Sequence, residues 1–327
     1  MRIPFLNKTS PVSVAFNMQW RRGPYGGGNQ WLGQMMPYLK RCGYKTTSRL
    51  DEKVDCVLGT HAGLGSDGLA FSYDAVLRAK QKNPRLRCIQ RINDNDIRKG
   101  TTTMDAYLAE CNRAADHTVF VSEWLRDYHA ERWFDRSLPH SVIYNGADPS
   151  VFHPFQGNIW KQGKSLRLVT HHWSDNPAKG FPVYEALDTA IAEGKLPGVE
   201  LWIVGRWPRG IRWQAAKTFP ACSGHRLAAL LKQCHVAVTA SRYEPGAMHP
   251  VEAMQCGLPL LYTADTGGTV ELGREFGVLL GEDLGSAFQM LRENYVDLRK
   301  AVLSQAPSGD VMCATYRRVI QQLVCAE

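Results

Sequence analysis

The sequence predicts an α/β protein with two doubly wound domains, each built on a parallel sheet. A length of 327 residues suits two domains of ordinary size. Short apolar runs rich in β-branched residues alternate with helical patterns along the chain, which is typical of parallel strands covered by helices. Residues 157–164 (GNIWKQGK) have the composition of a linker. We therefore expect domains at residues 1–157 and 158–305, followed by a helical segment at 306–327.

The expected elements follow this alternation in order. In the first domain, apolar runs predict strands at 12–17, 45–50, 54–60 and 86–92. Helical patterns alternate with them, including an amphipathic helix at 71–82. The segments HTVFV and HSVIY add two later strands. In the second domain, the apolar runs LRLVTHHW, ELWIVG, HVAVTAS and LPLLYTA predict strands, and residues 284–303 predict a long helix.

Composition and charge exclude several classes of protein. No run of 18 apolar residues occurs and the N-terminus lacks a signal-peptide pattern, so we expect a cytoplasmic protein. The nine cysteines are odd in number and never form CxxC, which favours buried free thiols over disulfides or a zinc site. Residues 1–150 hold 21 Lys and Arg against 15 Asp and Glu, a net charge of +6; residues 151–327 hold 18 against 16, or +2. A phosphate-bearing substrate or peripheral contact with an anionic membrane suits this charge, while no nucleic-acid motif is present.

The most informative stretch is residues 235–261. A predicted strand leads into a loop with Glu244, and a helix that begins near Pro250 carries Glu252. Ligands bind at the carboxyl ends of strands in open α/β sheets, so both carboxylates are candidate contacts. Each has an ordinary explanation if taken singly, because acidic residues favour helix N-termini and loop carboxylates are usually solvated. The loop N–H groups form a candidate anion site, contributed by Gly246, Ala247 and Met248.

Two polar or glycine-rich segments of the first domain are further candidates. The glycines at 26–28, Gly27 and Gly28 among them, allow close approach of a phosphate or sugar, although a tight turn explains them as well. After the strand at 86–92, the polar segment RINDNDIRKG contains Asp94 and Asp96 in a DxD spacing. That spacing occurs in metal–diphosphate sites, but three-residue matches are common by chance and helix capping is an alternative.

The residues SRYE before the loop and EAMQCGLPLL after it resemble the signature of the retaining, family-four glycosyltransferases of GT-B fold. In that signature two glutamates are separated by seven residues, as Glu244 and Glu252 are. The segment NGADPSVFHP, at 145–154, also resembles the end of the family's first domain. The resemblance implies two Rossmann-like domains that face each other across a cleft, with the C-terminal helix packing back on the first.

The resemblance also implies roles for single residues. Glu252 would bind the ribose hydroxyls, Glu244 would lie beside the transferred sugar, and Lys179 would neutralise the donor diphosphate. The glycine loop at 26–28 would face the donor diphosphate and the acceptor. Asp94 would reach the acceptor hydroxyl.

Two departures from the family pattern are visible. The family's Gly-Phe-Gly after the first glutamate is replaced by Pro-Gly-Ala-Met-His, and the arginine that helps to bind the diphosphate is missing. His172 or Arg206 could supply the missing charge. The function implied is transfer of a sugar from a nucleotide-diphosphate sugar to an acceptor hydroxyl with retention of configuration, without a cofactor or an obligatory metal. The acceptor would be a glycan, a lipid-linked compound or a small molecule.

Two alternatives remain at this point. A GT-B enzyme of another reaction, such as a sugar-nucleotide epimerase or a phosphorylase, would share the fold and the acidic pair. A non-catalytic protein that binds nucleotide-sugars is the second alternative, because of the missing arginine and the altered loop.

Overall fold

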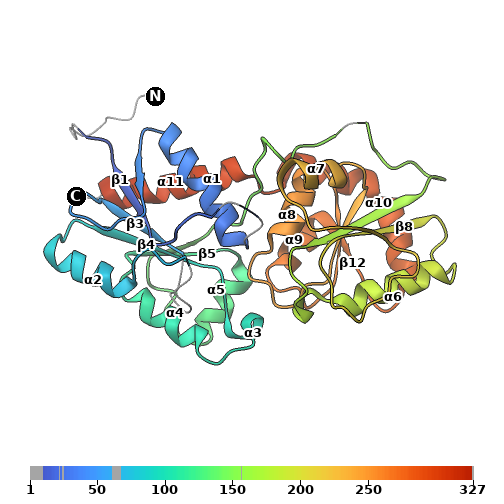
Figure 1. The fold of residues 1–327 in the computed structure, drawn as a ribbon, viewed down its shortest axis with the longest axis horizontal. Coiled ribbons are helices and arrows are strands. Elements are labelled where there is room, and N and C mark those ends of the chain that lie inside the picture. Colours follow the sequence, from blue (N-terminus) through green and yellow to red (C-terminus); the bar gives the residue numbers. More distant parts are fainter. Residues whose placement is uncertain (1–9, 22, 24–25, 61–67, 156, 326–327) are drawn as a thin grey trace. The chain divides into compact units, whose positions relative to one another are not determined.

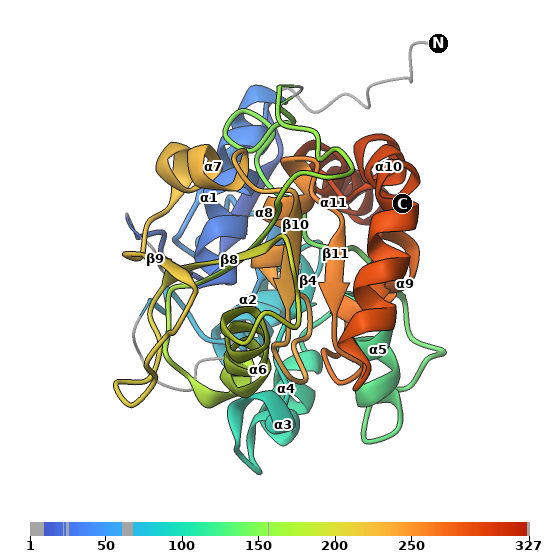
Figure 2. The same cartoon turned by 90° about the vertical axis from the view of Figure 1, so that its right-hand side faces the viewer.

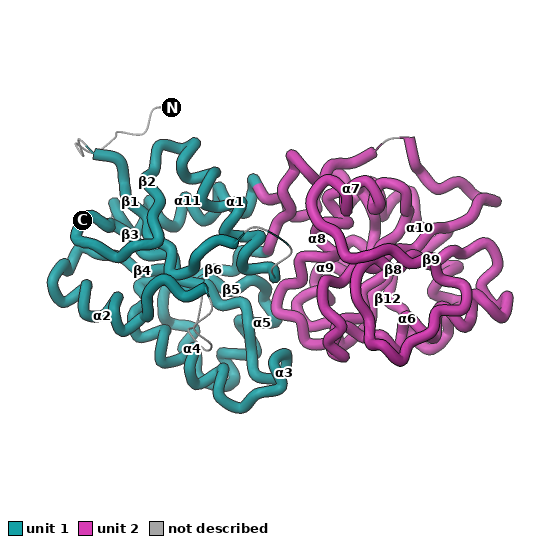
Figure 3. The backbone as a smooth tube through the Cα atoms, viewed as in Figure 1, with its two compact units in different colours: residues 1–144, 310–327 teal, residues 145–309 magenta. Residues whose placement is uncertain are grey.

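The chain forms two compact units, each with its own parallel sheet. The computed structural model describes residues 10–21, 23, 26–60, 68–155 and 157–325. One unit contains residues 1–144 and 310–327, and the other contains residues 145–309 (Figure 3). Each sheet has six strands flanked by helices, which confirms the predicted α/β class with two Rossmann-like units. The facing of the two units across a cleft stays a prediction.

The sheet of the first unit has the strand order β2-β1-β3-β4-β5-β6. The chain passes from β1 to one side and then returns to the other, so the order reverses between β1 and β3. This reversal leaves a crevice at the carboxyl ends of the strands, where open sheets bind ligands. The strands are β1 Ser13–Phe16, β2 Lys45–Thr47, β3 Cys56–Gly59, β4 Arg87–Ile92, β5 His117–Phe120 and β6 His140–Val142.

The C-terminal helix belongs to the core of this first unit. Trp31 of α1 lies between Phe16 of β1 and Tyr316 of α11, with ring centroids 6.0 and 5.4 Å away. Helices α1 and α11 therefore lie side by side on one face of the sheet (Figure 1). The helices of the unit are α1 Gly27–Arg41, α2 Tyr73–Lys82, α3 Asp96–Lys99, α4 Met104–Asn112, α5 Glu123–Ala130 and α11 Gly309–Cys325.

The sheet of the second unit has the order β12-β11-β10-β7-β8-β9, with its reversal between β7 and β10. Strand β9 was not predicted from the sequence. Its three residues form an edge strand with Lys217 and Thr218 exposed, so no buried apolar run marks it. The strands are β7 Leu166–His172, β8 Val199–Gly205, β9 Lys217–Phe219, β10 Val236–Thr239, β11 Leu260–Tyr262 and β12 Gly277–Leu279.

Helices α6 and α10 pack on one face of the second sheet, and α7 and α8 lie on the other (Figure 2). Tyr184 of α6 and Tyr295 of α10 are both fully buried in the core of the first of these faces. The helices of the unit are the 3-10 turn η1 Pro177–Lys179, α6 Phe181–Ala192, α7 Gly224–Leu231, α8 Met248–Gln255, α9 Thr269–Phe276 and α10 Leu284–Gln305.

The two units meet in sequence at Tyr144–Asn145 and at Gly309–Asp310, rather than after residues 157 and 305. Residues just beyond the first junction bond within the second unit. The side chain of Asn145 donates to the carbonyl oxygen of Gly246 at 2.7 Å, and Ala147 forms a parallel bridge with Ser308. The linker composition at 157–164 therefore marks a surface loop of the second unit and not the junction.

All nine cysteines lie in the described residues and are free thiols, and six of them are buried. This confirms the prediction of free thiols. Burial raises the pKa of the Cys88 thiol to about 12, so this group stays protonated at neutral pH. Within the described part of the chain, no helix is long and apolar enough to cross a membrane.

Ile320 on α11 is fully buried in the core of the first unit, whereas Val311 on the same helix is 63% exposed. We expect Ile320→Ala to lower the free energy of unfolding of this unit by about 2–5 kcal/mol, because it leaves a cavity. Val311→Ala is the matched control and should change it by less than about 0.5 kcal/mol. Urea titrations followed by circular dichroism measure both, and equal effects would contradict the burial of α11.

Candidate active site

Charged side chains converge where the strand order of the second unit reverses. Strands β7 and β10 are parallel neighbours, with Leu168 paired to Val236, so their carboxyl ends lie at the same edge of the sheet. Lys179 follows β7 and Glu244 follows β10. In doubly wound sheets this reversal is the position at which ligands bind. The sequence therefore places two opposite charges at the binding edge of this unit.

Lys179 and Glu244 form a buried ion pair. The ammonium of Lys179 donates to Oε1 of Glu244, and the side chains are only 11% and 10% exposed. Taking either charge out of water alone would cost several kcal/mol, so each carboxylate or ammonium here needs its partner. The structure thus brings together the two residues for which the family resemblance implied contact with the transferred sugar and with the diphosphate.

A glycine allows this pair to form. Gly180 has φ +77°, and a Cβ placed there would lie 1.9 Å from the carbonyl oxygen of Ala240. The turn after β7 therefore packs directly on the end of β10, which any side chain would prevent. The N–H of Arg242 also donates to the carbonyl of Ala178 at 2.7 Å. These contacts bring Lys179 within reach of the loop that carries Glu244.

The backbone directly before Glu244 is strained. Tyr243 has φ +53°, which is a rare conformation for a bulky residue. Its N–H donates to the carbonyl of Asp265 at 2.9 Å, and Glu244 forms a parallel bridge with Gly267. Strain of this kind costs about 1–3 kcal/mol and persists only where the surroundings hold it. The segment after β11 therefore fixes the direction of the Glu244 side chain.

Glu252 is held by a residue to which sequence analysis assigned no role. Oε2 of Glu252, on α8, lies 2.8 Å from Nε2 of His171 at the end of β7, and Glu252 is 4% exposed. The ring of His249 packs near His171, with centroids 5.8 Å apart, and its Nε2 bonds to Thr239 Oγ1 at 2.8 Å. No local pattern identifies His171 as the partner of Glu252, because the contact joins the end of β7 to α8, 81 residues later in the chain.

His172 and Arg206, the two candidates for the missing positive charge, differ in their environments. The ring of His172 packs against Phe181 and Tyr184 of α6, and its centroid also lies 5.3 Å from that of His249 on α8. Burial lowers the pKa of His172 well below 6.5, helped by nearby Lys179 and His171. This environment disfavours the charged form of His172, so His172 is poorly suited to carry the missing positive charge. Arg206 is exposed at the end of β8.

The loop before α8 provides backbone donors. Helix α8 begins at Met248, two residues before the expected Pro250, and Ala247 at its N-cap makes no side-chain capping bond. Helix N-termini leave N–H groups without intrahelical acceptors, which makes them anion sites. The side-chain amide of Asn145 donates to the carbonyl oxygen of Gly246 and so holds this loop in place. The three predicted residues Gly246, Ala247 and Met248 thus lie at one helix N-terminus.

The candidate residues of the first unit lie at the carboxyl edge of its sheet. Gly27 and Gly28 begin α1 directly after the loop that follows β1. A Cβ on Gly28 would meet only ordinary contacts, at 3.7 Å or more, so packing within the unit does not require this glycine. Asp94 follows β4, and its Oδ2 is 2.9 Å from the ammonium of Lys99. Burial raises the pKa of the Asp94 carboxyl, although Lys99 opposes this effect.

The DxD spacing has a capping explanation. Oδ1 of Asp96 accepts hydrogen bonds from the N–H of Met104 at 2.8 Å and from Oγ1 of Thr101 at 2.5 Å, and Oδ2 accepts from the N–H of Asp105 at 3.3 Å. Asp96 therefore caps the N-terminus of α4 with both oxygens. This arrangement supports the helix-cap alternative over a metal–diphosphate site.

Comparison with known proteins agrees with this arrangement. Residues 214–280 match the model of the family described as glycosyl transferases group 1. The matched span contains both Glu244 and Glu252, so the family resemblance found in the sequence is confirmed there. No curated protein matches the chain in sequence.

Solved structures of the GT-B class resemble the whole chain. Sucrose-phosphate synthase from Thermosynechococcus elongatus is 15% identical with a TM-score of 0.69, covering 97% of this chain and 100% of that one. Anabaena HepE in complex with UDP-glucose is 17% identical, with a TM-score of 0.67 and coverage of 95% and 100%. Starch synthase IV from Arabidopsis thaliana, whose catalytic domain is bound to ADP and acarbose, is 12% identical, with a TM-score of 0.65 and coverage of 97% and 100%. At these identities the likeness establishes the GT-B fold.

The neutral state of His172 predicts a pH dependence. The unfolded chain binds a proton at this residue below about pH 6.5 and the folded chain does not, so the second unit loses stability as the pH falls below 6.5. We expect His172→Gln to flatten this slope by up to about 1.4 kcal/mol per pH unit. Urea titrations between pH 5 and 8 measure it. The exposed His225→Gln is the control, and an equal change there would contradict the burial effect.

The ion pair predicts strong energetic coupling between its two residues. We expect Lys179→Met to destabilise the second unit by about 3–5 kcal/mol, because the buried carboxylate of Glu244 loses the compensating charge of Lys179. Adding Glu244→Gln should restore most of that loss. The exposed pair of Arg242 and Asp265, 2.6 Å apart, provides the matched cycle and should couple by less than about 1 kcal/mol. Similar coupling in both cycles would contradict the importance of burial.

Proposed function

We propose that the chain is a glycosyltransferase that moves a sugar from a nucleotide-diphosphate sugar to an acceptor hydroxyl with retention of configuration. The observation that carries this proposal is the convergence of Lys179, Glu244 and Glu252 at the strand-order reversal of the second unit, within or beside the span matched by the family model. A base, a diphosphate and a sugar require contacts in that order along one sheet edge. Carboxylates at two separated points, with a cation and backbone donors nearby, suit such a ligand.

Each donor contact has a chemical reason. The carboxylate of Glu252, oriented by His171, accepts hydrogen bonds from vicinal hydroxyls such as those of a ribose. Lys179 and the N–H groups of the loop before α8 face the diphosphate, and exposed Arg206 is the remaining candidate for a second cation. Glu244 then contacts the hydroxyls of the transferred sugar.

The chemistry follows from the charges. The leaving nucleoside diphosphate gains negative charge as the glycosidic bond breaks, and Lys179 with the loop amides would stabilise it. We propose that this stabilisation requires no metal, because both oxygens of Asp96 already cap α4. A glutamate paired with an ammonium is a weak nucleophile, so Glu244 would orient the sugar and not form a covalent bond to it. In the first unit, Asp94 would accept a hydrogen bond from the acceptor hydroxyl, with Gly27 and Gly28 beside the donor diphosphate.

The direct test is binding followed by product analysis. Purified protein is titrated with UDP-, ADP- and GDP-sugars in thermal unfolding assays, since a ligand at 100 times its Kd stabilises by about 2.7 kcal/mol. HepE binds UDP-glucose and starch synthase IV binds ADP, which makes these two nucleotides the first to test. Sugar transfer is then followed with labelled donor, and the anomeric configuration of the product is read by NMR.

Variants separate the roles of the two glutamates. We expect Glu252→Gln to abolish most of the donor-induced stabilisation, and Glu244→Gln to keep it while lowering kcat by about 10²–10³-fold. The exposed Glu275→Gln is the control and should change neither. Donor binding without transfer in the wild type would favour a non-catalytic protein, and a changed sugar on the nucleotide would favour an epimerase. Either outcome would overturn the proposed function.

A further inference from the structure

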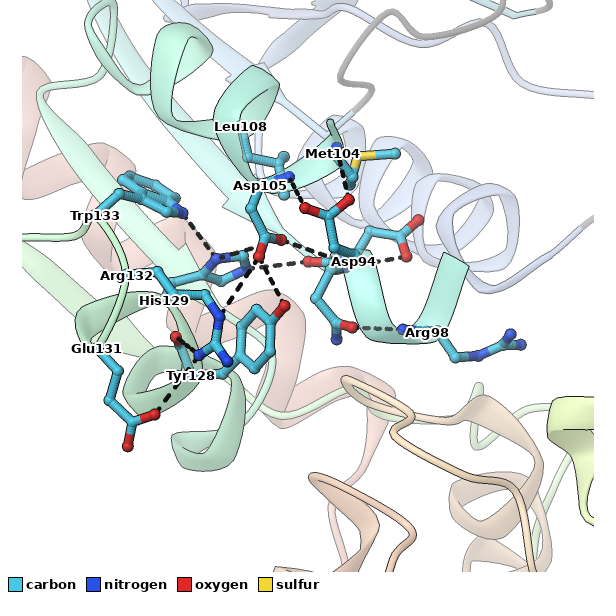
Figure 4. A network of polar contacts seen from close by, with 12 residues as sticks. Asp94, Arg98, Met104, Asp105, Leu108, Tyr128, His129, Glu131, Arg132 and Trp133 are labelled. Atoms are coloured by element: carbon cyan, nitrogen blue, oxygen red, sulfur yellow. Dashed lines mark hydrogen bonds and ion pairs between the residues drawn. The ribbon is translucent and has the colours of Figure 1, made fainter. Parts of the chain in front are cut away.

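A histidine without solvent contact lies beneath the loop that carries Asp94. His129, on α5, is 0% exposed and is enclosed by aromatic rings, with centroid distances of 5.0 Å to Tyr128, 5.3 Å to Trp133 and 6.1 Å to Phe120. Its hydrogen-bond partners connect it to that loop (Figure 4). A histidine so far from water cannot exchange protons with solvent in this conformation. Its function must therefore act through its neighbours.

The two hydrogen bonds of His129 define its protonation. Nε1 of Trp133 is only a donor, so Nδ1 of His129, 2.9 Å away, must accept and carries no proton. The carbonyl oxygen of Asp94 is only an acceptor, so Nε2 of His129, 3.0 Å away, must donate. The ring is therefore the neutral Nε2–H tautomer. Burial lowers the pKa of His129 to about 4, which agrees with this state.

This assignment excludes an ion pair with the nearby carboxylate. Nδ1 of His129 lies 4.0 Å from Oδ1 of Asp105, but without a proton it has no charge to share. Asp105 has other partners. Its Oδ2 accepts from the hydroxyl of Tyr128 at 2.7 Å, and its Oδ1 accepts from the N–H of Asp96 at 3.0 Å. The neutral ring of His129 therefore accepts from Trp133 through Nδ1 and donates to the main chain of Asp94 through Nε2.

The backbone of the Asp94 loop is held from three sides. His129 holds the carbonyl of Asp94, Asp105 holds the N–H of Asp96, and the side chain of Asn95 accepts from the N–H of Arg98 at 2.7 Å as the cap of α3. Asp94 itself keeps a side chain that is 23% exposed. These hydrogen bonds therefore fix the position of the main chain at Asp94, and with it the point from which the carboxylate of Asp94 projects.

We propose that His129, oriented by Trp133, is a positioning residue that sets the place of the Asp94 carboxylate for the acceptor hydroxyl. This inference rests on the proposed function of Asp94. His129 carries no proton to or from the substrate, because both of its nitrogens are used inside the unit. A displacement of about 1 Å in such a contact lowers turnover by about 100-fold, so a single main-chain hydrogen bond can control the rate.

The first test uses kinetics of graded variants. We expect His129→Leu, which removes the donor, to lower kcat/KM for the acceptor by about 10- to 100-fold without changing donor-induced stabilisation. His129→Gln places an amide N–H near the position of Nε2 and should recover activity to within about 3-fold of wild type. Trp133→Phe keeps an aromatic ring at position 133 but removes the N–H that fixes the tautomer of His129. Its kcat/KM for the acceptor should lie between those of the two His129 variants.

The control is His140→Gln, a half-buried histidine of the same unit whose Nδ1 lies 2.8 Å from the carbonyl oxygen of Leu138. It should leave the acceptor kinetics unchanged. Urea titration shows that each variant is folded before its kinetics are compared. Unchanged acceptor kinetics in folded His129→Leu, or no recovery in folded His129→Gln, would overturn the inference.

The second test does not depend on activity. In ¹⁵N-labelled wild-type protein, the ring of His129, assigned by its loss in His129→Gln, should show a protonated Nε2 and an unprotonated Nδ1 between pH 5.5 and 8. In Trp133→Phe a share of the Nδ1–H tautomer should appear. A charged ring or an Nδ1–H tautomer in the wild type would overturn the inference.

The proposed function fails separately from the inference. If the wild type transfers no sugar to any acceptor, the function assigned to Asp94 falls. The fixing of Asp94 by His129 is then decided by the ring spectrum and by the carbonyl ¹³C shift of Asp94. That shift should move in His129→Leu and return toward the wild-type value in His129→Gln. An unmoved shift in His129→Leu would overturn the inference.

Discussion

The buried ion pair between Lys179 and Glu244 is the contact on which the second unit's site depends. Neither charge is stable there alone, because desolvation of an isolated ammonium or carboxylate costs several kcal/mol. The pair exists because Gly180 lets the turn after β7 pack on Ala240 at the end of β10. On the far side, Tyr243 accepts an unfavourable backbone conformation so that Glu244 points back toward Lys179. Packing, strain and charge are thus balanced around one contact.

This balance has a consequence for the proposed donor. An entering diphosphate would share Lys179 with Glu244, and the sugar hydroxyls would share Glu244 with Lys179. A preformed pair of this kind keeps both groups in position without solvent between them, which lowers the reorganisation needed when a ligand arrives. A donor would therefore replace part of the contact between Lys179 and Glu244 with its own polar groups, and no mobile side chain would have to become ordered.

Two neighbouring histidines at the end of β7 have different partners. His171 bonds to Glu252 of α8, while His172 is buried among Phe181 and Tyr184 of α6 and His249 of α8. The two residues are chemically identical, but only His171 bonds to Glu252, the residue that we propose binds the ribose. Burial of His172 disfavours the positive charge that the family pattern provides near this position. In the first unit, Asp94 likewise follows a strand at the carboxyl edge of the sheet. The next two residues, Asn95 and Asp96, cap α3 and α4.

The sequence by itself determined the two parallel-sheet units, because burial periodicity and turn residues are local properties of the chain. The pair Glu244 and Glu252 came from the resemblance of its spacing and flanking residues to the family signature. The sequence also determined most strands and long helices, but not edge strand β9, whose exposed residues carry no apolar signal. Only the tertiary structure decided that His171 bonds to Glu252, that His172 is buried and that His129 donates to the carbonyl of Asp94. The junction of the units at residue 144 was likewise decided by bonds from Asn145 to a loop a hundred residues away. These outcomes depend on which distant elements pack together, and contacts between distant elements leave no periodic trace in a single sequence.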